Sequence, residues 1–247
     1  MAYKLWLSLK TQFRVPISIF FTLLFPLVMM VAMLLSYGNF SIGNGLHFID
    51  KYFLISSSIG LLPLTLISFP TFLTELIEKK TTKRLYYFGV NIRTMLVADV
   101  ISYFIIASLS LAVNILVARL VYRLHLPDMS HFIAFLAQVF YAIIPLLLIG
   151  ACLGLLIHNS RIVLPVGMLL MFITYMLIGI FTPFKDLPEG LKNMGQFLPI
   201  KYVANDFFDI WQGKTFFVSQ FLQLNSIWLL IGLVGLIILL KAKKGQL

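Results

Sequence analysis

Charged residues and cysteine are scarce in this sequence. Charged residues make up 11% of its 247 positions and hydrophobic residues 60%, whereas soluble domains average about 25% charged and about 45–50% apolar residues. This composition excludes a soluble globular enzyme, a disordered chain and a fibrous repeat. The single cysteine, Cys152, has no second cysteine with which to form a disulfide, and it lacks the spacing of a metal site.

The groups that intramembrane chemistry requires are also missing. Ion-coupled carriers and intramembrane hydrolases need ionisable side chains inside the bundle. Asp99 is almost the only one in the apolar runs, and we expect it to pair with a base such as Arg93 or to cap its helix end. Paired carboxylates, an HExxH pair and a GxSxG elbow do not occur. The sequence GKT at 213–215 ends like a phosphate-binding loop, but Phe208 stands where the loop needs its first glycine. We therefore predict no enzyme activity, bound cofactor, metal or nucleotide site in this chain.

Long apolar runs are what the sequence does contain. Six of them approach or exceed the roughly 20 residues that cross a bilayer, at 15–37, 52–73, 95–118, 132–157, 162–181 and 222–240. The first is too long for a signal peptide, and no small-residue cleavage site follows it. Mild polar residues in the runs, such as Ser56 and Asn114, are expected to hydrogen-bond between helices, and the GxxxG pair Gly150 and Gly154 permits close helix contact. The runs predict an all-α polytopic membrane protein with six transmembrane helices, and residues 1–247 as one transmembrane domain.

Basic residues are unevenly shared between the two sets of loops. Alternating helices place twelve of them on the side of both termini: Lys4, Lys10, Arg14, Lys79, Lys80, Lys83, Arg84, Arg93, Arg161, Lys241, Lys243 and Lys244. Seven fall on the other side: Lys51, Arg119, Arg123, Lys185, Lys192, Lys201 and Lys214. Cytoplasmic loops are enriched in Lys and Arg. We therefore expect a multi-pass protein of the cell membrane with both termini in the cytoplasm, and we attribute the net charge of +10 to its loops and not to nucleic-acid binding.

Residues 1–14 predict an amphipathic helix that lies in the membrane interface. Its apolar face includes Trp6, Leu9 and Phe13, and its polar face includes Gln12 and Arg14. The alternative is a plain positively charged anchor before the first span.

The segment 75–94 is the most informative cytoplasmic stretch. It mixes acids and bases and contains three consecutive aromatic residues, as a protein-docking surface would. The residues that we expect on this surface are Glu75, Glu78, Lys79, Lys80, Lys83, Arg84, Tyr86, Tyr87, Phe88 and Arg93. The alternative is a solvated run of charges.

The connection 182–221, between the fifth and sixth runs, is long for a loop and is divided by prolines. Apolar residues recur at helical spacing at Leu191, Met194 and Phe197, and again after Pro199. We expect two short amphipathic helices on or in the outer leaflet, where irregular backbone must pack against protein. An ordinary surface loop is the alternative.

These patterns carry a family resemblance. The chain resembles the membrane subunits of type-2 ATP-binding-cassette (ABC) exporters, the daunorubicin-exporter-like permeases. The main match is the pattern PF…LP…L…FLP…Y, at Pro183, Phe184, Leu187, Pro188, Leu191, Leu198, Pro199 and Tyr202. The stretch 78–100 is similar to the family's segment between its second and third helices. It departs from that segment where Thr81 and Thr82 replace a Gly-Thr pair and Val90 stands near the position of a proline.

The resemblance implies a complex of two membrane subunits and two cytosolic ABC ATPase subunits. The second membrane subunit would be an identical or a sister chain, and ATP and magnesium would bind to the ATPase. Segment 75–94 would hold the coupling helix that docks into the ATPase, and residues 1–14 the connecting helix beside it. The outer gate would include Pro183, Phe184, Pro188, Leu198, Pro199 and Tyr202.

We expect the permease subunit of an ABC exporter. Nearly uncharged spans suggest a lipophilic or amphiphilic cargo, such as a drug, a lipid-linked molecule or an antimicrobial peptide. The alternative function is a stand-alone membrane immunity or sensor protein that binds a ligand without pumping. Such a protein would not need a docking segment.

Overall fold

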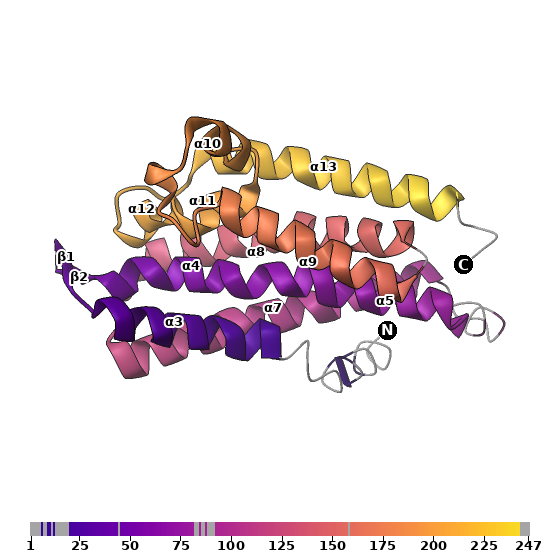
Figure 1. Ribbon diagram of the computed structural model, residues 1–247, viewed down its shortest axis with the longest axis horizontal. Helices are drawn as coiled ribbons and strands as arrows, with labels where there is room; N and C mark the ends of the chain where they lie inside the picture. The colour runs from indigo at the N-terminus through magenta and orange to yellow at the C-terminus, as the bar shows by residue number, and fades with distance from the viewer. Residues whose placement is uncertain are drawn as a thin grey trace.

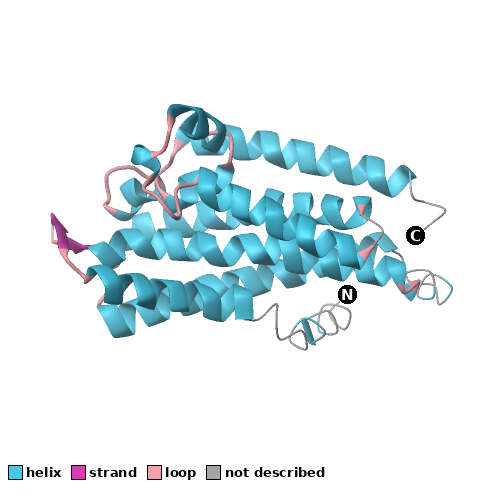
Figure 2. Cartoon of the chain, viewed as in Figure 1, coloured by secondary structure: helices cyan, strands magenta, loops and turns pink. Residues whose placement is uncertain are grey.

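The computed structural model describes residues 20–43, 45–81, 92–157 and 159–242, together with Trp6, Leu9, Lys10, Gln12, Arg84 and Tyr87. It gives the backbone alone at positions 92 and 93. The described chain is an elongated helical bundle (Figure 1). Figure 2 shows that helix dominates and that the one pair of described strands lies at a single end of the bundle.

Among the residues described, six helical segments are long and apolar enough to cross a membrane, which confirms the predicted fold class. They are Phe20–Tyr37, Phe48–Glu78, Thr94–Tyr122, Met129–Leu156, Ser160–Leu177 and Ser219–Ala242. The first comprises η1 (Phe20–Leu24) and α3 (Phe25–Tyr37), and the second α4 (Phe48–Pro63), η2 (Leu64–Ser68) and α5 (Phe69–Glu78). The others are α7 (Ile92–Tyr122), α8 (Met129–Leu156), α9 (Ser160–Leu177) and α13 (Ser219–Ala242).

The second span forms the centre of the bundle. In its apolar stretch of 18 residues, 89% of the positions are buried, against 22% for the corresponding stretch of the first span and 17% for that of the sixth. Accordingly, Figure 1 shows α3 and α13 at opposite edges, with α4 between them. The prediction that the fifth span extends to position 181 is wrong: α9 ends at Leu177, and Gly179 turns the chain with φ 82°.

The connections lie at two ends of the bundle. At one end are β1 (Ser41–Gly43), β2 (Leu46–His47), η3 (Phe184–Asp186), α10 (Glu189–Gly195), α11 (Pro199–Ala204) and α12 (Phe207–Trp211). We call this the short-helix end. At the other, the terminus end, α5 and α8 finish, α9 begins, and α13 leads to the C-terminus (Figure 1). The antiparallel pair β1–β2 was not predicted from the sequence.

The short helices predicted for 182–221 are present, with one correction to their number. Their place in the outer leaflet stays a prediction. The second predicted helix is divided into α11 and α12, so the described connection has three α-helices. The division falls at Asn205, whose amide Nδ2 donates to the carbonyls of Lys201 and Ile178 at 3.1 and 2.9 Å. An asparagine side chain that bonds to nearby backbone competes with helix continuation.

A proline inside the first span explains one of the polar contacts between helices there. Pro26 has no N–H to donate to the carbonyl of Thr22, and the Ser110 hydroxyl from α7 donates to that carbonyl at 2.5 Å. The Ser56 hydroxyl donates to the Pro26 carbonyl at 2.8 Å and accepts from the Asn114 amide at 2.9 Å. Ser56 and Asn114 thus form an interhelical hydrogen bond, as expected for polar residues of the spans. The same expectation is wrong for four other hydroxyls, which donate to carbonyls of their own spans: Ser57, Ser58, Thr65 and Thr174.

The middle of the second span is a π-helical segment, η2, bracketed by Pro63 and Pro70. Its backbone lies directly against glycines of α8 and α9. A Cβ atom at Gly150 would lie 2.2 Å from the Thr65 carbonyl oxygen, and one at Gly167 would lie 2.2 Å from the Leu66 carbonyl oxygen. Only a residue without a side chain fits these two positions.

We predict that Gly150→Ala destabilises the bundle. The added methyl group would collide with backbone and not with a flexible side chain, and overpacking of this kind costs about 1–3 kcal/mol. The measurement is the thermal unfolding midpoint of the purified chain in mild detergent. Gly190→Ala is the matched control, because nothing lies within 4 Å of a Cβ atom there. Equal midpoints for the two variants would contradict the packing described.

Candidate functional site

The two acidic residues of segment 75–94 interact with other groups of the same chain. Glu75 forms an ion pair with Lys79 at 2.6 Å on the exposed face of the last turn of α5. The hydrogen bond and charge of Glu75 raise the pKa of Lys79. The Glu78 carboxylate accepts the backbone N–H of Ser160 at 3.1 Å, at the positively polarised start of α9. Glu78 therefore ties this segment to the fifth span.

A second contact joins the same end of α5 to α8. The hydroxyl of Thr74 is buried and lies 2.9 Å from the carbonyl oxygen of Gly154 and 3.2 Å from that of Ile157. A Cβ atom at Gly154 would lie 2.7 Å from the Pro70 carbonyl oxygen, so both members of the GxxxG pair serve contacts within the bundle. The start of segment 75–94 is thus packed on two spans at once.

Beyond α5, basic and aromatic side chains of the segment are exposed. Lys80 turns the chain with φ 54°, Arg84 is exposed, and Tyr87 is 86% exposed. The other predicted members lie outside the described residues: Lys83, Tyr86, Phe88 and the side chain of Arg93. Asp99 is buried in α7, and its pairing with Arg93 stays a prediction.

The N-terminal residues contact the bundle. Leu9 packs against the hydrophobic core, and Trp6 is half exposed with the Lys10 ammonium 4.7 Å from its ring centre. The assignment of Gln12 to a polar face is wrong, because its side chain is 3% exposed. A side chain directed at the bundle is buried whatever its polarity. Phe13 and Arg14 lie outside the described residues.

The predicted gate residues divide by burial. Pro183 and Pro188 are exposed, Phe184 and Leu198 are half-buried, and Pro199 and Tyr202 are buried. All six residues of α11 are buried, so this helix is part of the bundle and not a surface loop.

Aromatic rings of α12 pack against aromatic rings of the spans. The Trp211 ring lies 4.7 Å from that of Phe53 and 5.0 Å from that of Phe135, between centroids, and its indole N–H donates to the His125 carbonyl at 2.9 Å. Phe207 and Phe221 stack edge to face at 4.8 Å. These rings come from α4, α8, α12 and α13, and sequence analysis did not assign them to a site.

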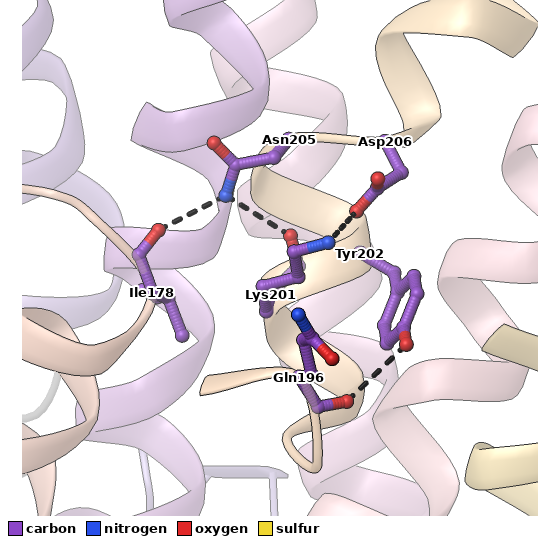
Figure 3. A network of polar contacts seen from close by, with 6 residues as sticks. All are labelled: Ile178, Gln196, Lys201, Tyr202, Asn205 and Asp206. Atoms are coloured by element: carbon purple, nitrogen blue, oxygen red, sulfur yellow. Dashed lines mark hydrogen bonds and ion pairs between the residues drawn. The ribbon is translucent and has the colours of Figure 1, made fainter. Parts of the chain in front are cut away.

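An ion pair lies inside the short-helix end (Figure 3). The Lys201 ammonium is 2.8 Å from the Asp206 carboxylate, and the Lys201 side chain is only 10% exposed. The ammonium also lies 4.7 Å from the ring centre of Phe184 and 4.5 Å from that of Tyr202. Carboxylate and aromatic faces thus share the charge of one buried lysine.

Hydrogen bonds fix the surroundings of this pair, as Figure 3 shows. Asn205 connects α11 to the Ile178 carbonyl at the end of α9, and the Tyr202 hydroxyl donates to the Gln196 carbonyl at 3.2 Å. Burial raises the pKa of Tyr202, and the nearby charge of Asp206 raises it further. Sequence analysis counted Lys201 only as a loop base, because a five-residue separation from an acid is common and marks no pair by itself.

A buried carboxylate that sequence analysis missed lies near the same end. Asp50, in the first turn of α4, is 1% exposed and accepts the backbone N–H groups of His47 and His125, each at 2.7 Å. It joins the strand pair to the connection between α7 and α8. The position, three residues after the helix cap, is typical of a capping box and could have indicated part of this role.

The metal-site and phosphate-loop patterns considered from the sequence concern the part of the chain that the structure describes. Those residues contain no cluster of three or more His, Cys, Asp or Glu side chains that could hold a metal ion. Lys214, from the loop-like sequence at 213–215, lies 3.5 Å from Asp209 in an exposed ion pair. The geometry is that of a packed bundle with a charged terminus end and a short-helix end in which α11 is buried.

Comparison with known proteins gives one match. The model of the family described as ABC-2 family transporter protein matches residues 48–241, from the start of α4 to the last turn of α13. No curated protein and no solved structure matches the chain. The matched region takes in five of the six spans and both ends of the bundle. The chain therefore belongs to the ABC-2 transporter family, as a multi-pass membrane component.

Proposed function

We propose that this chain is the permease subunit of an ABC exporter of the daunorubicin-exporter-like type. Two copies of a cytosolic ABC ATPase and a second permease, identical or a sister chain, complete the complex. Both termini lie in the cytoplasm, so the terminus end faces the ATPase. The observation that carries the proposal is the family match together with a basic, aromatic segment 75–94 whose base is fixed to α8 and α9.

The anchoring of this segment gives the proposal its mechanism. Lys79, Lys80, Lys83 and Arg84 would meet the ATPase, with Tyr87 beside them. Glu78 and Thr74 hold the end of α5 to α9 and α8. A displacement imposed by ATPase closure on the docking segment would therefore move three spans together, and not a free loop.

A lipophilic or amphiphilic cargo agrees with the spans. Six of the nine acidic residues lie at the short-helix end, in connections or at helix ends: Asp50, Asp128, Asp186, Glu189, Asp206 and Asp209. A highly charged cargo would require charged partners along its path, whereas a drug, a lipid-linked molecule or an antimicrobial peptide would not. In this proposal α11 and the Lys201–Asp206 pair close the path at the outer side.

The docking role predicts loss of the ATPase after charge reversal at Lys79, Lys80, Lys83 and Arg84. Complementary charges set partner binding at such a surface, and reversing four of them should lower the ATPase activity that co-purifies with the tagged chain by at least about tenfold. The chain is purified from its native membrane in mild detergent. Protease protection of a C-terminal tag verifies that the topology is unchanged.

The control reverses four bases at the short-helix end: Lys51, Arg123, Lys185 and Lys192. This variant should retain the ATPase. Full retention by the first variant would reject the docking surface. A wild-type chain that yields no ATPase at all, in a detergent that preserves such complexes, would favour a stand-alone immunity or sensor protein.

The gate role predicts that Lys201→Met opens the short-helix end. The substitution leaves the Asp206 carboxylate without its ammonium partner. Leaving a buried acceptor unsatisfied costs about 1–3 kcal/mol, which corresponds to about a tenfold larger open population. The measurement is the rate at which a membrane-impermeant maleimide labels Val203→Cys, a fully buried position of α11, in a Cys152→Ser background.

Lys192→Met is the control, since Lys192 lies on α10 and forms no ion pair among the described residues. The double variant Lys201→Met with Asp206→Leu should label more slowly than Lys201→Met alone, because no unpaired carboxylate remains. Identical labelling rates in all four proteins would exclude the ion pair as a closing element.

A further inference from the structure

An apolar groove of about 360 Å³ runs along the outside of the bundle between α7 and α8. One wall comes from α7, with Leu111, Ile115 and Arg119, and the other from α8, with Phe132, Leu136 and Phe140. The groove lies within two membrane spans and is open on one side. Its volume is in the range of small-molecule sites, which start at about 300 Å³.

The wall of the groove offers almost no hydrogen bonding. Its one hydroxyl, on Ser108, donates to the Phe104 carbonyl of its own helix at 2.8 Å. Phe140 packs against Phe104 with a centroid distance of 5.6 Å beside this serine. A polar ligand would gain nothing from such walls, whereas a hydrocarbon chain would be well accommodated.

A single cation stands at the short-helix end of the groove. Arg119 lies in the last turn of α7, and one guanidinium N–H donates to the Leu124 carbonyl at 2.8 Å. That bond fixes the group at the mouth of the groove, while a guanidinium has five N–H donors in all. Among the described residues no acid forms an ion pair with Arg119. The mouth therefore presents a positioned positive charge in the last turn of a membrane span.

We infer that this groove binds one acyl chain of an anionic phospholipid from the surrounding leaflet, with the phosphate of the lipid on Arg119. The apolar walls match the hydrocarbon, and the guanidinium matches a phosphate in charge and in planar geometry. The inference concerns the lipid contact of this chain alone, and it does not depend on the ATPase partner.

Native mass spectrometry of the delipidated full chain tests the site. Phosphatidylglycerol and phosphatidylethanolamine are titrated in separate experiments. Wild-type chain should retain phosphatidylglycerol in preference, and Arg119→Gln should lower that preference by about threefold, as expected for a partly exposed charge contact. Ala112→Trp, which fills the groove, should abolish tight retention of both lipids.

Two controls separate this site from general surface effects. Arg123→Gln removes a nearby exposed base that does not line the groove, and Leu109→Trp introduces the same side chain elsewhere on α7. Both should bind lipid as wild type does. Equal retention of the two lipids by wild type, or the same loss in Arg123→Gln, would overturn the inference. So would an Ala112→Trp variant that keeps its lipid and loses a dimer, because the groove would then be an interface between copies.

Discussion

The close approach of backbone to glycine in the middle of the bundle is the contact on which the rest of the structure depends. Lipid tails are as apolar as leucine, so spans associate by close packing and interhelical hydrogen bonds and not by the hydrophobic effect. Here the carbonyls of Thr65 and Leu66 meet Gly150 and Gly167 without an intervening side chain. Those carbonyls belong to the π-helical turn η2, which directly follows Pro63. Three spans are held at one level by this contact.

The same central span connects the two ends of the molecule. At the short-helix end its first turn holds Asp50, which binds two separate backbone segments, and at the terminus end its last residue, Glu78, caps α9. In the proposed exporter, force from the ATPase enters beside Glu78. π-helical turns inside α-helices are frequent at functional sites and provide a place where a helix can change its bend. The π-helical turn η2 lies between the two ends, against α8 and α9.

Much of this architecture could be predicted from the sequence because the bilayer imposes it. The thickness of the hydrocarbon sets the length of apolar runs, which gave six spans within a few residues, and prolines such as Pro188 and Pro199 marked the short helices. The contacts between distant positions could not be predicted in the same way. The pairing of Lys201 with Asp206 and the burial of Gln12 depend on which surfaces pack together after folding. A single sequence contains no direct information about those contacts.

Hydrogen–deuterium exchange on the chain bound to its ATPase, with and without ATP and magnesium, tests most directly whether the two ends act as one unit. If the central span transmits motion, ATP should change exchange at residues 195–212 of the short-helix end as well as next to segment 75–94. Changes confined to the terminus end would contradict the account, because the central span would then not transmit motion from one end of the bundle to the other.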